Sequence, residues 1–90
     1  MNGYRVITYN DETVGEIVDE SENMLVVECG HWPRKVRHML PKRYASVDES
    51  ARSVRMQVSK ELLASSPRLS SNQPIDERAV AEFFGLDDEI

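Results

Sequence analysis

The stretch from Thr13 to Cys29 decides the fold of this chain. It contains two runs rich in β-branched and apolar residues, Thr-Val-Gly-Glu-Ile-Val-Asp at 13–19 and Met-Leu-Val-Val-Glu-Cys at 24–29, separated by a polar segment. Such runs bounded by polar turns predict two neighbouring strands. Gly15 inside the first run predicts a bulge or a sharp bend, as the corners of small barrels require. The two strands are therefore expected to belong to a curled sheet.

Three further strands are predicted around this pair. They cover residues 4–9, 36–40 and 53–58. Alternation along the second of them places Val36, His38 and Leu40 on one face. Ser59 followed by residues 60–64 predicts a short helical turn with a serine N-cap. Because no strand–helix–strand unit is present, we expect an antiparallel sheet that closes into a small barrel.

A linker and a helix are predicted after this barrel. The segment 68–74 belongs to a stretch rich in Ser, Asn and Pro and is predicted as the linker, and a helix is predicted within residues 75–90. Asp76 suits the N-cap of this helix and Gly85 suits a left-handed C-cap. Its apolar stripe consists of Ala79, Val80, Phe83 and Phe84. A helix this short is marginal in isolation, so the stripe is expected to pack either on the chain's own barrel or on a second copy or another protein.

Length and composition exclude several classes of protein. The chain has 90 residues, a net charge of −5 and a single cysteine. This length supports one hydrophobic core, so a single small domain is expected. One cysteine excludes an internal disulfide and favours a reducing compartment. The sequence has neither an apolar run long enough for a transmembrane helix nor a signal-peptide layout at its first residues, so we expect a soluble cytoplasmic protein without membrane insertion.

The charge is distributed in three blocks. Residues 1–30 carry a net charge of −6, residues 31–68 carry +6, and residues 69–90 carry −5. One interpretation is that neighbouring strands pair opposite charges across the sheet, at a few tenths of a kcal/mol for each pair. The other is that the middle block forms a basic face that meets an anionic partner. The sequence leaves both interpretations open.

Little in the sequence points to catalysis or metal binding. The glycine-rich phosphate motifs and the zinc-protease motif are absent. Cys29, His31 and His38 are the three residues that suggest a metal, but a structural zinc site requires four ligands, usually in two close pairs. A catalytic arrangement of Cys29 with His31 would also require a pocket and an orienting third group. We therefore expect no enzymatic activity, no metal and no cofactor, and interpret His38 as a core histidine.

The segment from His31 to Arg43 is the strongest candidate for a binding surface, because it gathers five basic residues around the only tryptophan. The candidate partner-binding residues are Trp32, Arg34, Lys35, Arg37, Lys42 and Arg43, together with Phe83 and Phe84 of the predicted helix. Three interpretations are open: a solvated hairpin, a protein interface, and a nucleic-acid interface. Trp and Arg are enriched in protein interfaces, whereas the sequence pI near 4.9 opposes nucleic-acid binding.

Three short motifs follow one another between residues 14 and 67. They are Val14-Gly15-Glu16-Ile17-Val18-Asp19, then His38-Met39-Leu40-Pro41, then Val58-Ser59-Lys60-Glu61-Leu62-Leu63 leading to Pro67. In order and spacing they resemble the PRC-barrel family. The resemblance implies a six-stranded barrel over residues 1–67, members that bind other macromolecules, and no catalytic residues common to the family. The expected fold is mainly β: a small antiparallel PRC-type β-barrel with a short helical turn and one C-terminal α-helix.

These expectations together predict a non-enzymatic interaction or adaptor module. A protein partner is expected, and a homodimer formed through an open sheet edge or through the Phe83/Phe84 helix is one form of it. The alternative is an RNA- or ribosome-associated assembly factor that binds through the basic segment 31–43. That alternative predicts binding that falls steeply with salt and weakens when Arg34, Lys35 and Arg37 are neutralised.

Overall fold

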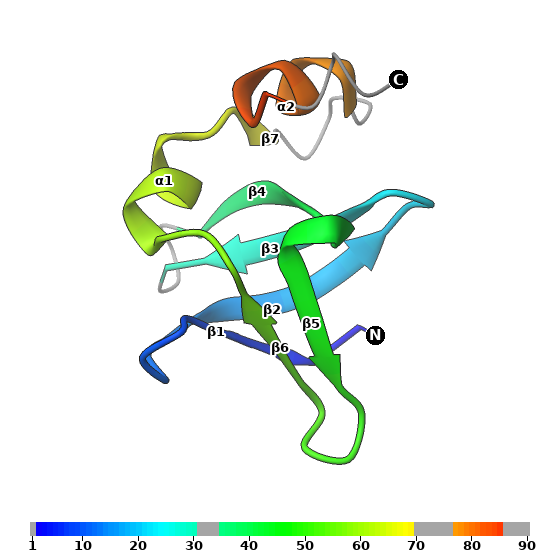
Figure 1. Ribbon diagram of the computed structural model, residues 1–90, viewed down its shortest axis with the longest axis vertical. Helices are drawn as coiled ribbons and strands as arrows, with labels where there is room; N and C mark the ends of the chain where they lie inside the picture. Colours follow the sequence, from blue (N-terminus) through cyan, green and yellow to red (C-terminus); the bar gives the residue numbers. More distant parts are fainter. Residues whose placement is uncertain (1, 31–34, 70–76, 86–90) are drawn as a thin grey trace.

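The computed structural model describes residues 2–30, 35–69 and 77–85 and is mainly β (Figure 1). The strands and helices, in chain order, are β1 (Arg5–Ile7), β2 (Thr13–Glu20), β3 (Met24–Cys29), β4 (Val36–Pro41), the 3-10 helix η1 (Lys42–Tyr44), β5 (Ala45–Asp48), β6 (Ser53–Met56), α1 (Lys60–Ser65), β7 (Arg68–Leu69) and α2 (Glu77–Phe83). The five strands and the short helix predicted before the linker are thus present. The elements η1, β5 and β7 were not predicted, and β7 occupies the first two residues of the predicted linker.

All strands belong to one seven-stranded sheet in the order β5-β6-β1-β2-β3-β4-β7. Strands β4 and β5 are joined by the three residues of η1, yet they stand five places apart in that order. Such a short connection requires the sheet to curl, so that the end of β4 comes close to the start of β5. The sheet is therefore a curled half-barrel, which confirms the curl predicted from the bulged second strand but not its closure into a complete barrel.

The expectation of a wholly antiparallel sheet is wrong at one pair. Strand β6 runs parallel to β1, with Val54 beside Val6, whereas every other pair in the sheet is antiparallel. The reason is the crossover at η1, which carries the chain from β4 to the far edge of the curled sheet before the β5–β6 hairpin returns beside β1. Alternating polarity and turn residues do not reveal such a crossover, because it depends on how far the sheet curls.

Strand β2 bends as Gly15 predicted. Its register shifts against β1 next to Gly15 and again against β3 around Val18. The backbone of β3 comes so close to Gly15 that an added Cβ would lie 2.2 Å from the carbonyl oxygen of Glu28. Only glycine fits at this point, and the close approach lets β2 wrap around the core.

The sheet buries apolar side chains on both faces of β3 and β4. The inner cluster consists of Val6, Ile17, Leu25, Val27, Leu40, Val54, Met56 and Leu63. The outer cluster consists of Met24, Val26, Met39 and Val80, with Val18 and Phe84 packed against it. Because α2 supplies Val80 to the outer cluster, the apolar stripe of this helix packs on its own sheet. The run Met-Leu-Val-Val at the start of β3 is consequently buried on both sides.

The helix caps agree with the sequence where the structure describes them. The hydroxyl of Ser59 accepts a hydrogen bond of 3.0 Å from the N–H of Leu62 at the start of α1. Gly85 has a φ of +73° and its N–H donates to the carbonyl of Glu82, which is the left-handed C-cap predicted for α2. The predicted N-cap Asp76 and the linker residues 70–74 lie outside the described residues.

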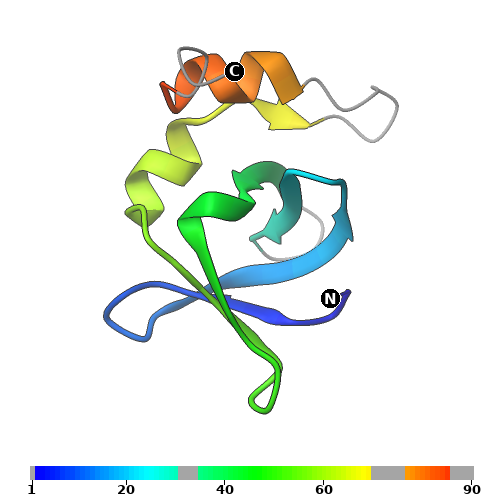
Figure 2. The ribbon, with the colours of Figure 1, turned by 45° about the vertical axis from the view of Figure 1, so that its right-hand side comes forward.

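Figures 1 and 2 show α2 and the β5–β6 turn at opposite ends of the molecule. The helix lies over β4 at one end, and the hairpin extends away from both helices at the other. No helix in the described ranges has the length and apolar character needed to cross a membrane. The two ends therefore differ in kind: one is covered by a helix, and the other exposes a sheet edge.

Candidate interaction surface

Glu28 of β3 pairs with two cations of the predicted basic segment. Its Oε2 lies 3.0 Å from Nε of Arg37, which stands directly opposite on β4, and its Oε1 lies 3.2 Å from Nζ of Lys35. Hydrogen bonds from Arg37 and then Lys35 hold the pKa of the Glu28 carboxyl below its ordinary value. Two of the candidate phosphate-binding cations therefore share one carboxylate within the fold.

Three further ion pairs connect the acidic first block with the basic middle block. They join Lys42 to Glu20 with 3.0 Å between Nζ and Oε2, Arg55 to Asp11 with 2.6 Å between Nη2 and Oδ1, and Lys60 to Glu12. Arg55 also donates to the carbonyl oxygen of Thr8 at 2.8 Å. Of the two interpretations of the charge blocks, pairing of opposite charges within the fold is the one seen for these cations, although among the described ion pairs only Arg37–Glu28 joins facing residues of neighbouring strands. Their charge is therefore largely balanced locally.

The predicted partner-binding residues fall into separate groups. Trp32 and Arg34 lie outside the described residues. Lys35, Arg37 and Lys42 form the ion pairs described above, and Arg43 is exposed on η1. Three of the described candidates, Lys35, Arg37 and Lys42, are therefore already engaged by carboxylates within the fold.

An aromatic cluster joins η1 to α2. The ring centroid of Tyr44 lies 5.9 Å from that of Phe84, and the Phe83 ring meets Phe84 edge-on at 5.1 Å. Phe84 is half-buried against the outer cluster, whereas Phe83 is 38% exposed. Phe84 therefore serves to attach α2, and Phe83 presents an aromatic ring to solvent.

Exposed apolar side chains also occur on parts of the molecule that the sequence did not single out. They are Tyr9, Val47 and Leu62, with Tyr9 the most exposed at 71%. Val47 lies in β5, a strand at the edge of the sheet that was missed from the sequence. Its signal is the alternation of small apolar and polar residues in Ala45-Ser46-Val47-Asp48, which is short and weak. These side chains leave apolar surface that a partner could cover.

Of the residues considered for catalysis or metal binding, the structure describes Cys29 and His38. Burial, and then the nearby Glu28 carboxylate, raises the pKa of the Cys29 thiol, which keeps it in the weakly nucleophilic protonated form. His38 is buried and its Nδ1 lies 3.0 Å from Oγ of Ser66. Within the described ranges, no three His, Cys, Asp or Glu side chains gather as a metal site would require. His31 lies outside the described residues.

His38 acts as part of the core at the corner between α1 and β7. The hydroxyl of Ser66 donates to the carbonyl of Leu63 at 2.5 Å, so Nδ1 of His38 must carry the proton in the bond to Ser66. Burial lowers the pKa of His38, and the guanidinium of Arg68, opposite it on β7, lowers the pKa further. Hydrogen bonds to the backbone of Ser66 and Pro67 act in the other direction, but the pKa remains below its ordinary value. The imidazole thus connects β4 to the α1–β7 corner in its neutral form.

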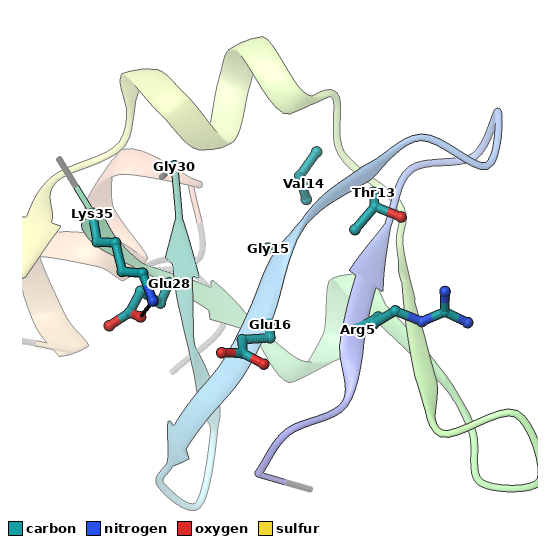
Figure 3. A pocket seen from close by; sticks show the side chains of 8 residues that line it. All are labelled: Arg5, Thr13, Val14, Gly15, Glu16, Glu28, Gly30 and Lys35. Atoms are coloured by element: carbon teal, nitrogen blue, oxygen red, sulfur yellow. Dashed lines mark ion pairs between the residues drawn. The ribbon is translucent and has the colours of Figure 1, made fainter. Parts of the chain in front are cut away.

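A shallow pocket of about 330 Å³ opens where β2 begins and β3 ends (Figure 3). It is lined by Arg5, Thr13, Val14, Gly15, Glu16, Glu28, Gly30 and Lys35. Figure 3 shows Lys35 reaching toward Glu28, whereas Arg5 extends away from Glu16. Arg5 and Glu16 are both exposed, and the charges of the lining cancel. The pocket therefore defines no class of ligand.

Comparison with known proteins gives no family assignment, since no family model and no curated protein sequence matches this chain.

Proposed function

We propose that this chain is a non-enzymatic protein-interaction module of the PRC-barrel type. One observation carries the proposal: Lys35, Arg37 and Lys42 of the predicted basic surface are paired within the fold, while apolar side chains and a sheet edge stay open. Exposed apolar and aromatic groups supply most of the binding free energy in protein interfaces. The raised pKa of Cys29 and the buried position of His38 give no support to catalysis.

Nucleic acid is the less favourable partner for the same reason. A phosphate group that recruits Lys35 or Arg37 has to compete with the Glu28 carboxylate, which lies next to both cations. The net charge of −5 adds a general repulsion of polyanions. The RNA alternative therefore lacks a free basic face among the described residues. We further propose a reducing, cytoplasmic location, which suits a chain whose one cysteine is a free thiol.

An affinity-capture experiment separates the two functions. The tagged full chain is incubated with an extract of its native cell, with and without nuclease and at low and high salt, beside the matched double variant Lys35→Gln/Arg37→Gln. We expect a bound protein, another species or an untagged copy of this chain, that withstands nuclease and is retained by the double variant. Retention of RNA alone, lost with nuclease, with high salt and in the double variant, would overturn the proposal in favour of the nucleic-acid function.

A further inference from the structure

Strand β5 is an edge strand whose outer side is open. It pairs with β6 on one side, and it ends the seven-stranded sheet on the other. Ser46, Val47 and Asp48 are exposed, with Val47 at 43%. The opposite edge is formed by β7, which has only two residues. Of the two edges, β5 is therefore the one long enough to accept another strand.

The hydrogen-bond pattern identifies which backbone groups of β5 point outward. The N–H of Gln57 donates to the carbonyl of Tyr44 at 2.7 Å, so this pair belongs to the hydrogen-bonded set of the antiparallel ladder. Because such pairs alternate, Ser46 and Asp48 also bond to β6. Ala45 and Val47 then direct their N–H and C=O groups toward the open edge, and Glu49, the first residue of the turn after β5, directs its N–H there.

One of these outward groups is already satisfied within the chain. The N–H of Ala45 donates to the carbonyl of Lys42, the first residue of η1, and the carbonyl of Glu49 turns inward to accept from the N–H of Arg52 in the β5–β6 turn. Among the described residues, the C=O of Ala45, both groups of Val47 and the N–H of Glu49 are left for a partner strand. This set is self-complementary.

We propose that the outer edge of β5 pairs antiparallel with β5 of a second copy, around a two-fold axis at Val47. In this register Val47 faces Val47 of the partner copy and the two valines exchange two hydrogen bonds. The N–H of Glu49 in each copy then reaches the C=O of Ala45 in the other, which adds two more. The Ala45 N–H and the Glu49 C=O are already satisfied within each copy and need no partner.

Charge complementarity favours a second copy as the occupant. The strand begins two residues after the basic Arg43 of η1, ends at the acidic Asp48 and is followed by the acidic Glu49. An antiparallel two-fold arrangement brings the basic end of each β5 over the acidic end of the other, with Arg43 diagonal to Glu49. The hairpin extends away from α2, so the helix does not obstruct this approach (Figure 1). The inference rests on the proposed interaction function and names its partner.

The register makes disulfide trapping a direct test. In a background in which Cys29→Ser removes the native thiol, Val47→Cys places two thiols across the axis at a Cα separation of about 5.5 Å, within the range of a disulfide. Glu49→Cys is the matched control, because residue 49 of one copy faces residue 45 of the other. We expect a covalent dimer from Val47→Cys under mild oxidation and little from Glu49→Cys. Equal trapping of both, or none, would overturn the register.

Light scattering over a range of concentrations tests the backbone pairing itself. Val47→Ala and Val47→Pro shorten or reshape the same side chain, but only proline removes the N–H. We expect Val47→Pro to raise the dissociation constant of the dimer at least about tenfold above Val47→Ala, since it deletes both valine–valine hydrogen bonds. Equal dissociation constants would contradict the proposal.

A charge exchange keeps the test independent of whether the proline variant folds. Glu49→Lys and Arg43→Glu should each weaken self-association, and mixing the two should restore a heterodimer. A monomer at every concentration, with no heterodimer on mixing, would overturn the inference. If that monomer still captures a nuclease-resistant protein, only the homodimer fails; if it captures RNA alone, the interaction function fails as well.

Discussion

Strands β3 and β5 belong to the same sheet but occupy opposite environments. Val26 of β3 is 1% exposed between the sheet and α2, whereas Val47 of β5 is 43% exposed at the edge. Glu28 of β3 pairs with two cations, whereas Glu49 lies at the exposed acidic end of β5. The difference separates two roles within one small sheet. The β3 region stabilises the fold, whereas the β5 edge is the surface that we propose for binding.

The largest effect should come from Gly15, where β2 approaches the backbone of β3. Gly15→Ala places a methyl group against the carbonyl of Glu28, and neither backbone has room to move. We expect a loss of about 3 kcal/mol in the free energy of unfolding, measured by urea denaturation. Gly3→Ala is the control: its Cβ meets nothing within 4 Å, so only its positive φ of +88° costs stability, about 1 kcal/mol. Equal losses would show that β2 does not depend on this contact.

A matched pair of valine substitutions tests the comparison itself. Val26→Ala removes buried methyl groups from the outer cluster and should lower the free energy of unfolding by about 2 kcal/mol. Val47→Ala should change it by less than about 0.5 kcal/mol in the dilute monomer, because its side chain is largely solvated. A large loss at Val47 would mean that β5 belongs to the stabilising core and is not a free edge.

His38 should make stability depend on pH just below neutrality. In the unfolded chain it titrates near its ordinary pKa of 6.5, but in the fold its pKa is lowered, chiefly by burial. The native state therefore binds fewer protons below pH 6.5, and the free energy of unfolding falls as the pH drops, by at most about 1.4 kcal/mol per pH unit.

The control for this pH effect is His38→Asn, which retains a donor for Ser66 but does not titrate. Between pH 6.5 and 5.5 the parent should lose more stability than the variant as the pH drops. His31 is present in both proteins, so it does not contribute to the difference between them. Glu28 and Glu20 have pKa values lowered from 4.5 and do not titrate in this window. An identical pH dependence of the two proteins would contradict a neutral, buried His38.

The smallest stability effect should come from the Glu28 ion pairs. Glu28→Gln leaves Lys35 and Arg37 without their carboxylate and should cost about 0.5 kcal/mol, decreasing with added salt because both cations are partly exposed. Glu16→Gln is the control: Glu16 stands opposite Glu28 in the register, so removing its charge should be neutral or slightly stabilising. A loss of stability in Glu28→Gln that does not change with salt would contradict a contribution from these ion pairs. The same variant should also strengthen non-specific RNA binding, because Lys35 and Arg37 lose their carboxylate.

Much of the fold was predictable because its signals are local. The apolar run of β3 gave its bounds at Met24 and Cys29, Ser59 gave the start of α1, and Gly85 gave the end of α2. The parallel β1–β6 pair was not predictable, since it follows from curling of the whole sheet around η1. The short strands β5 and β7 were missed because each is stabilised by pairing with a distant neighbour, not by its own composition.

The candidate site was less predictable than the fold. The sequence gathered Lys35, Arg37 and Lys42 into a basic segment, but it did not reveal that Glu28 and Glu20 would stand beside them. Glu28 faces Arg37 from the neighbouring strand because of the strand register, which the local sequence does not reveal. The edge at Val47 had no chemical signature at all, since its binding groups are backbone N–H and C=O.

Residue-resolved hydrogen exchange of the β5 amides tests the central claim most directly. In the dilute protein the N–H of Val47 faces solvent and should exchange freely, whereas the N–H of Ser46 bonds to β6 and should be protected. Raising the protein concentration should protect Val47 and leave Ser46 unchanged, as strand pairing across the two-fold axis requires. A Val47 amide that is already protected when dilute, or that exchanges at the same rate at every concentration, would contradict the account.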